Sequence, residues 1–297
     1  MRSSLVVAAM SCIVLAACAL GSAPPNELPV WNVAEKRWMQ ERELVDALAG
    51  ARYRLLGEIH DNPAHHVIRA RLLRAIAASG ARPAVVLEQF DLAHDDTLRA
   101  AQLAGADAER LADAGGLDRK AWAWPLHEPI VEAALRAGLT LRAGNLSRAR
   151  LRNEAIDANA QARLRDARWS AVQTARLREA IVDGHCGRLP DSVVPRLLQA
   201  QRLRDAAMAQ AVVDAATDDG AILVAGNGHV RKDTGVPAYL DARERIASVG
   251  FIEASEDVLR ARVLPRDMAE DVASYDFVWI TPTVAREDPC ASLERPA

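Results

Sequence analysis

Lysine is almost missing from this sequence, and several other shortages narrow the class of protein further. Lysine occurs only at positions 36, 120 and 232, so arginine supplies nearly all of the 37 basic side chains, and 40 acidic ones bring the formal net charge to -3. Because no long basic run is present, the chain lacks the electrostatic footprint of a nucleic-acid-binding protein. Sixteen glycines and fourteen prolines are too few for a low-complexity chain, and a hydrophobic fraction of 50% excludes a disordered one.

Several catalytic and cofactor motifs are also absent from the sequence. It contains no Gly-x-Ser-x-Gly elbow, no His-Glu-x-x-His, no Cys-x-x-Cys and no phosphate loop ending in Gly-Lys-Ser/Thr. The chain therefore lacks the commonest sequence signatures of hydrolases and nucleotide-binding proteins. The Cys-x-x-Cys-His motif that attaches c-type haem is missing too. Covalent haem of that type is therefore excluded.

The first residues have the character of a targeting segment. Arg2 is followed by an apolar run over residues 5–17, which at about 1.5 Å per residue is too short to cross a hydrocarbon core of roughly 30 Å. The run ends in Leu-Ala-Ala-Cys, which resembles a bacterial lipobox with Cys18 as the acylated residue. We expect residues 1–17 to be a lipoprotein signal peptide and residues 18–30 to be lipidated Cys18 and a tether. An ordinary secretory signal is the alternative.

The residue after Cys18 bears on the destination of such a lipoprotein. Ala19 stands there, where an Asp would signal retention in the inner membrane. The sequence therefore predicts a lipid anchor in the bacterial outer membrane, with the folded domain in the periplasm, if the source is Gram-negative.

Two cysteines remain once Cys12 is removed with the signal peptide and Cys18 carries lipid. In an oxidising compartment, Cys186 and Cys290 suggest one disulfide that closes a loop of about 100 residues. Two alternatives stay open at this point. Cys186, beside His185, can instead be a metal or haem ligand, or both thiols can be free.

Short apolar runs alternate with helical stretches along the rest of the chain. A helix is expected from the Asn62-Pro63 cap to about Ser79, and residues 147–217 have a helical composition. Strands are expected at residues 53–56, 84–87, 139–141 and 221–225, with weaker candidates at 245–253 and 277–281. This alternation predicts one domain over residues 31–297, a layered α/β/α fold with a central, largely parallel sheet. The long helical insert falls between the third and fourth strands.

Residues capable of chemistry follow several of these strands. Ligands bind at the carboxyl ends of strands in open α/β sheets, so we expect these side chains to converge. Two imidazoles and two carboxylates at one place could bind a metal ion such as Zn, Mn or Fe, or act as an acid/base pair on a bound substrate. The alternative is that each is only a helix cap or a satisfied turn residue. The candidates are Glu58 and His60 after the first strand, Glu88 after the second, Asn145 after the third, and Asn227 and His229 after the fourth.

The remaining histidines are weaker candidates. His65 and His66 begin the first predicted helix, where exposed histidines are usually ordinary surface residues. His127 follows an aromatic segment and is expected in the core, and His94 at the surface.

Several separated motifs stand out across roughly residues 40–250. They are Leu-Leu-Gly-Glu-Ile-His-Asp-Asn-Pro at 55–63 with His65 and His66, Val-Leu-Glu at 86–88, Gln-Arg-Leu-Arg-Asp at 201–205 with Met208, Gly-Asn-Gly-His-Val-Arg at 226–231, and Gly-Val-Pro at 235–237. In order and spacing, these motifs resemble those of the ChaN-like haem-binding lipoproteins. That family belongs to a superfamily with the Tiki proteins and the erythromycin esterase-like enzymes. The shared signature is a pair of Gly-x-x-His motifs plus a glutamate, which here are residues 57–60, residues 226–229 and Glu88.

The resemblance implies two functions. ChaN-like members imply haem binding in haem or iron uptake, associated with a homodimer and with a haem receptor or transporter as partner. Tiki-like members imply metal-dependent hydrolysis of peptidase or esterase type, in which His60, His229, Glu58 and Glu88 hold a divalent metal and carry the catalysis. A scaffold that has lost both roles is a third interpretation. The leading hypothesis is the haem-binding lipoprotein.

The resemblance also bears on the residues that would contact haem. Tyrosine ligation is associated with the family, and the tyrosines of this chain are Tyr53, Tyr239 and Tyr275. Tyr239 is the first candidate, and Tyr53 is expected in the core. His65, His66 and Arg231 complete the predicted haem-binding residues.

Overall fold

The computed structural model describes residues 30–147, 150–151, 158–167, 169–288 and 290–291. The predicted signal peptide, Cys18 and most of the predicted tether lie outside these residues. Within the described part of the chain, no helix combines the length and the apolar character needed to cross a membrane.

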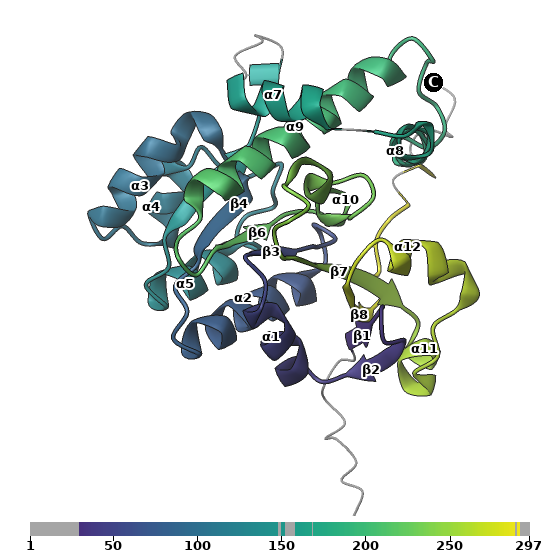
Figure 1. Cartoon of the computed structure of the whole chain (residues 1–297), viewed down its shortest axis with the longest axis horizontal. Helices are drawn as coiled ribbons and strands as arrows, with labels where there is room; N and C mark the ends of the chain where they lie inside the picture. The colour runs from purple at the N-terminus through teal and green to yellow at the C-terminus, as the bar shows by residue number, and fades with distance from the viewer. Residues whose placement is uncertain (1–29, 148–149, 152–157, 168, 289, 292–297) are drawn as a thin grey trace, which may run out of the picture.

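One mixed sheet of eight strands organises the described residues, in the order β2-β1-β8-β7-β3-β6-β4-β5 (Figure 1). All neighbours from β8 to β5 are parallel, and only β1 pairs antiparallel, with β2 and β8. Each strand expected from the sequence is present, and β1 and β2 are additional, because three-residue strands are too short to show a periodic pattern. The strands are β1 (Val30–Asn32), β2 (Arg37–Met39), β3 (Tyr53–Leu56), β4 (Ala84–Asp91), β5 (Leu141–Asn145), β6 (Ala221–Val224), β7 (Ile246–Ala254) and β8 (Phe277–Pro282).

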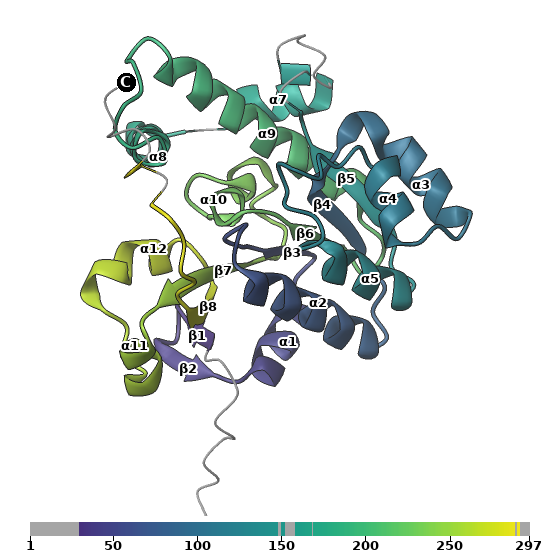
Figure 2. The same ribbon diagram turned by 180° about the vertical axis from the view of Figure 1, so that it is seen from behind.

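Helices cover both faces of this sheet, so the layered α/β/α prediction is confirmed (Figures 1 and 2). The α-helices are α1 (Glu41–Ala49), α2 (Pro63–Ala78), α3 (Asp95–Leu103), α4 (Ala108–Ala114), α5 (Glu128–Arg136), α7 (Ala158–Asp166), α8 (Ala171–Asp183), α9 (Val194–Ala215), α10 (Asn227–Val230), α11 (Glu256–Ala261) and α12 (Ala269–Ala273). Among the described residues there are also three 3-10 helices, η1 (Leu92–His94), η2 (Val236–Tyr239) and η3 (Arg266–Met268).

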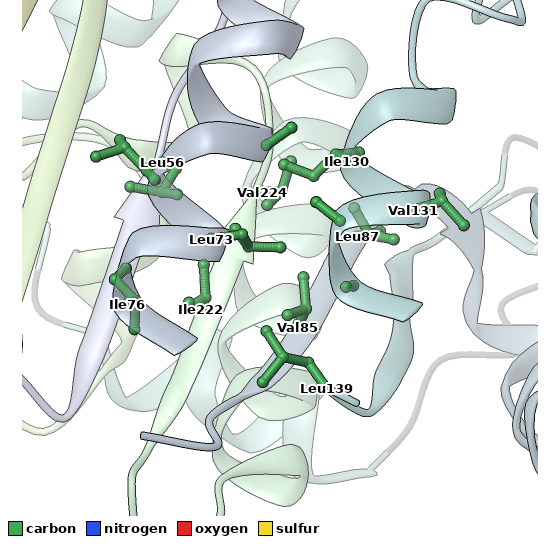
Figure 3. Close-up of a cluster of buried hydrophobic side chains, with 14 of the residues drawn as sticks. Leu56, Leu73, Ile76, Val85, Leu87, Ile130, Val131, Leu139, Ile222 and Val224 are labelled. Carbon is green, nitrogen blue, oxygen red and sulfur yellow. The ribbon is translucent and has the colours of Figure 1, made fainter. Parts of the chain in front are cut away.

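Adjacent residues of the central strands belong to opposite core layers. Leu56 of β3 packs in the layer formed with α1, α2 and α5, whereas Leu55 packs with α9 and η2 on the other face. Figure 3 shows the first layer, where Leu73 of α2 and Ile130 of α5 lie over Val224 of β6. Because side chains alternate along a strand, a strand covered on both faces must be apolar throughout. All four residues of β6 are buried, as this requires.

The helix after β3 begins where the sequence predicts. The side chain of Asn62 accepts a hydrogen bond from the backbone N–H of Ala64 at 2.9 Å, and Pro63 is the first helical residue. A proline fits there because the first helical N–H has no partner inside the helix. This cap sets the direction in which α2 leaves the end of β3, immediately beside Glu58 and His60.

Helices α7, α8 and α9 occupy the chain between β5 and β6. The long α9 packs on the sheet through residues such as Met208 and Val212, while α7 and α8 pack against α9 (Figure 1). A disulfide joins Cys186, in the loop between α8 and α9, to Cys290 near the C-terminus, 104 residues further on. The predicted pairing is confirmed, and the alternative of Cys186 as a metal or haem ligand is wrong, because its sulfur is bonded to Cys290.

Candidate functional site

Glu58 and His60 lie just beyond the end of β3, and their side chains contact one another. The Nδ1 atom of His60 donates to Glu58 Oε1 at 2.6 Å, and the Nε2 atom of Gln89 donates to the same oxygen at 3.1 Å. Glu58 is 2% exposed, whereas the side chain of His60 is 50% exposed. The imidazole is thus held on one side by a buried carboxylate, while half of the side chain stays exposed to solvent.

Glu88 and His229 form a second pair beyond the ends of β4 and β6. Glu88 accepts from the backbone N–H of Gly226 at 2.7 Å, and its other oxygen lies 3.2 Å from His229 Nε2. The Nδ1 atom of His229 lies 2.5 Å from an oxygen of Asp205 on α9. Gln201, one turn earlier on α9, places its Nε2 3.2 Å from the same imidazole nitrogen.

The two pairs meet at Gly226. A Cβ atom built on this glycine would lie 2.9 Å from His60 Nε2 and 3.6 Å from an oxygen of Glu88, so the ring of His60 packs against the glycine backbone. The structure therefore brings together Glu58, His60, Glu88 and His229, which the sequence singled out. We call these four residues with Asp205 the Glu–His cluster.

Opposite charges govern the protonation of the cluster. Burial alone would lower the pKa of His229, but the carboxylates of Glu88 and Asp205 outweigh it and raise this pKa to about 10. Burial likewise opposes ionisation of Glu88, yet His229 holds the Glu88 pKa well below its ordinary value. At neutral pH, His229 is therefore an imidazolium bound between carboxylates. A metal ion bound by His229 would have to displace that proton.

A buried arginine lies behind Glu58. Arg69 of α2 is fully buried, contacts the Oε2 atom of Glu58, and donates to His66 Nδ1 at 2.8 Å. His66 in turn donates from Nε2 to the backbone carbonyl of His60 at 2.9 Å. Burial is the main reason that the pKa of His66 falls to about 4, so this imidazole is neutral. His66 thus supports the loop that carries His60.

Glu58, His66 and His127 form a group with the spacing of metal ligands. One potential ligand atom from each lies within 4.8 Å of the others. His127 is buried, as the sequence predicts, and its ring packs edge-on against His66 with 4.4 Å between centroids. Arg69 already supplies a positive charge to Glu58 in this place, so the group does not require a metal ion to balance that carboxylate.

Three of the predicted haem-binding residues lie apart from the Glu–His cluster and are engaged in the fold. His65 is 0% exposed, accepts from the backbone N–H of Ile59 at 2.9 Å, and contacts Thr281 Oγ1 at 2.8 Å. Arg231 forms ion pairs with Asp233 and Asp271. Tyr239 is 4% exposed, and its hydroxyl accepts from Arg202 Nε at 3.1 Å. A haem contact by any of the three stays a prediction.

Sequence reasoning missed three side chains that complete the cluster and its surroundings. Asp205 had a signal, because it closes the Gln-Arg-Leu-Arg-Asp segment that resembles a family motif. Arg69 stands one helical turn after His66, a spacing that places both on one face of α2, but nothing marks it as buried. Gln89 follows Glu88 in a strand and has no distinguishing pattern at all.

A pocket of about 940 Å³ opens between α7, α8 and α9. Its volume falls in the range of small-molecule sites. The pocket adjoins the Glu–His cluster through Gln201, which lines it and also contacts His229. Its apolar wall consists of Leu151, Leu164, Ile181, Leu197, Ala200 and Leu203, and its charged or polar lining of Gln161, Arg165, His185, Arg196, Gln199, Gln201 and Arg204.

The fold and the cluster define an α/β protein that carries a Gly-x-x-His motif at each of two strand ends. A family model described as haem-binding uptake, Tiki superfamily, ChaN matches residues 44–240. This chain belongs to that family. A search among curated protein sequences found no match.

Solved structures of similar shape are also known. ChaN of Campylobacter jejuni, described for cofacial haem binding, is 18% identical, with a TM-score of 0.66 over 86% of this chain and 96% of that one. At this identity the likeness shows a shared fold. The type III effector HopBA1 is 14% identical, with a TM-score of 0.43 over 86% of this chain and 97% of its own. A Bacillus cereus protein is 13% identical, with a TM-score of 0.42 over 72% of this chain and 69% of its own.

Proposed function

We propose that this protein binds haem non-covalently in the pocket between α7, α8 and α9. The observation that carries the proposal is the position and lining of that pocket. The described residues that line it fall between Leu151 and Arg204, inside the range matched by the haem-binding family model. The pocket combines an apolar wall with several cationic side chains.

This lining suits the chemistry of haem, a flat apolar ring that carries two carboxylates at one edge. Leu164, Ile181 and Leu197 offer apolar surface to a ring. Arg165 and Arg196 are exposed, and neither has an ion pair or side-chain hydrogen bond among the residues that the structure describes. Because guanidinium groups pair strongly with carboxylates, these two are available for the propionates.

The proposed setting is the outer membrane, where lipidated Cys18 would anchor the domain on the periplasmic side. The lipobox-like sequence supports this setting, and so does the Cys186–Cys290 disulfide, since disulfides persist in oxidising compartments. In that position the protein would hold haem or pass it to a receptor or transporter during haem or iron acquisition. A homodimer is part of the same proposal. The metal-dependent hydrolase is not proposed, because the matching family description names haem and no comparison favours hydrolysis.

Haemin titration tests the function. We expect the full-length chain, purified in detergent with its disulfide intact, to give a saturable Soret shift. Ala200→Trp, which places a large side chain in the pocket, should abolish the shift. Leu103→Trp, at a position 89% exposed on α3, serves as the matched control. Absence of saturable binding to the wild-type chain would refute the function, whereas equal binding by both variants would refute only the assignment to this pocket.

The setting needs its own experiment. Expression in a Gram-negative host with a radiolabelled fatty acid should label the wild-type chain in the outer-membrane fraction. Cys18→Ser should remove the label and release the protein from that fraction, while Cys12→Ser should leave both unchanged. Labelling that persists in Cys18→Ser would contradict the proposed anchor.

A further inference from the structure

Haem iron needs an axial ligand, and the pocket offers few. Imidazole, thiolate, thioether and phenolate are the side-chain groups that ligate haem iron in proteins. Among the described residues that line the pocket, His185 alone carries one of these groups. The other lining side chains are aliphatic, amide or guanidinium.

The hydrogen bond of the His185 ring leaves one of its two nitrogens suited to ligation. Its Nδ1 atom donates to the backbone carbonyl of Ile181 at 2.7 Å, which fixes the tautomer and leaves the lone pair on Nε2. Metal-ligating histidines commonly have this arrangement, with one ring nitrogen bonded to a carbonyl and the other directed at the metal. His185 is exposed, and no hydrogen bond occupies its Nε2 within the described part of the chain.

The backbone around His185 is held in place on both sides. His185 follows the last turn of α8, where its N–H donates to the carbonyl of Val182 at 3.1 Å. The next residue, Cys186, is bonded to Cys290. The carboxyl end of a helix carries partial negative charge, which favours a cation such as ferric iron nearby. A ligand on this anchored turn is better positioned than one on a free loop.

The tyrosines of the chain are placed elsewhere. Tyr53, Tyr239 and Tyr275 are the only three, and each is 3% or 4% exposed in a core layer of the sheet. None of them lines the pocket. Burial also raises the pKa of the Tyr239 hydroxyl, which opposes formation of the phenolate that iron would need. Arg202 already occupies that hydroxyl.

We infer that His185 is the axial ligand of the haem iron, through Nε2, while Arg165 and Arg196 bind the propionates. The inference rests on the proposed haem binding. It goes beyond that proposal by naming the atom that contacts the metal, and it moves the ligand from Tyr239 to the loop closed by the disulfide.

The test uses the full-length chain loaded with haemin and then reduced. Resonance Raman spectra of the ferrous wild-type protein should show an iron–histidine stretching band. In His185→Ala the band should disappear and the haemin dissociation constant should rise at least about tenfold, equivalent to about 1.4 kcal/mol. Added imidazole should restore the ferric wild-type spectrum in this variant. Because His185 is exposed, the substitution leaves the core intact, which far-ultraviolet circular dichroism can verify.

Two further variants separate the possible outcomes. His94→Ala removes an exposed histidine on η1, outside the pocket, and should keep the band and the affinity. Tyr239→Phe should also leave both unchanged. An iron–histidine band that survives in His185→Ala, or a spectrum that changes in Tyr239→Phe, would overturn the ligand assignment while haem binding stands. A wild-type chain that binds no haemin would instead refute the proposed function itself.

Discussion

The Nδ1 atom of His229 lies 2.5 Å from the Oδ1 atom of Asp205, although 24 residues separate them in the chain. The same arrangement recurs at His60, whose Nδ1 lies 2.6 Å from Glu58 Oε1. A carboxylate bonded to one ring nitrogen fixes the orientation of the ring and so the direction of the other nitrogen. Both Gly-x-x-His motifs therefore end in an imidazole whose orientation is set by a buried acid.

The charge on His229 predicts a pH-dependent stability. Its pKa is raised to about 10 in the folded chain, against 6.5 for a free histidine, because Glu88 and Asp205 outweigh the effect of burial. The stabilisation is therefore complete below about pH 6.5 and is lost as the pH rises towards 10, at no more than about 1.4 kcal/mol per pH unit. Urea unfolding should show His229→Gln far less stable than wild type at pH 6, with the gap narrowing by pH 10. A stability difference that stays constant with pH would contradict the raised pKa of His229. The control His94→Gln should be as stable as wild type at both pH values.

Arg69 is predicted to be essential for the fold around Glu58. Arg69→Met would leave the buried Glu58 carboxylate without its cation, so we expect a loss of about 3–5 kcal/mol in the free energy of unfolding. Adding Glu58→Gln should recover part of that loss, since the uncompensated charge is then gone. Arg74→Met, at an exposed position of the same helix, should change the stability by less than about 0.5 kcal/mol. Equal unfolding free energies for the Arg69 and Arg74 variants would argue against the ion pair.

Gly57 is predicted to tolerate no side chain. A Cβ atom there would overlap the Oδ1 atom of Asn227 and lie 3.0 Å from the carbonyl oxygen of Val249. Asn227 uses this oxygen to accept from the backbone N–H of Phe251 at 3.0 Å, so the clash would disturb the contact between α10 and β7. Gly57→Ala should cost about 1–3 kcal/mol in thermal or urea unfolding. Gly228→Ala, where a Cβ meets nothing within 4 Å, is the matched control and should be nearly neutral or mildly stabilising.

Arg165 and Arg196 of the pocket should control haem affinity through their charge. Arg165→Glu and Arg196→Glu each replace a cation by an anion beside the propionates, and we expect each to weaken haemin binding about tenfold at low salt. The difference from wild type should shrink at 1 M salt, where the screening length is about 3 Å. Arg178→Glu makes the same charge change on α8, outside the pocket, and should have little effect. Loss of the iron–histidine band in the Arg165 or Arg196 variant would instead indicate a displaced ring.

The disulfide should matter both for stability and for the pocket. Replacing Cys186 and Cys290 together by serine opens a loop of about 100 residues, and the free energy of unfolding should fall by about 2–4 kcal/mol. The haemin dissociation constant should rise while the iron–histidine band persists, since His185 keeps its own hydrogen bond to Ile181. Measuring both with the double variant distinguishes loosening of the loop from loss of the ligand. Unchanged affinity would show that α8 is positioned without the disulfide.

Much of the fold can be predicted from local patterns in the sequence. The strands of the parallel sheet are covered on both faces, so they read as short apolar runs, and the cap at Asn62 marks the start of α2 unambiguously. The convergence of Glu58, His60, Glu88 and His229 also follows, because parallel strands bring their carboxyl ends to one edge of the sheet. The β1–β2 hairpin could not be predicted from the sequence, because strands of three residues carry too little periodicity.

The sequence by itself determined the order of the elements, four of the five residues of the Glu–His cluster and the resemblance to a haem-binding family, because each follows from short contiguous segments. Tertiary structure alone decided which distant groups complete the site. Asp205 reaches His229 only because α9 packs on the sheet beside β4 and β6, and Arg69 meets Glu58 only because α2 packs on the opposite face of the same sheet. The pocket exists because α7 and α8 pack against α9, and the placement of His185 depends on that packing. Such contacts join segments far apart in the chain, and no local periodicity encodes them.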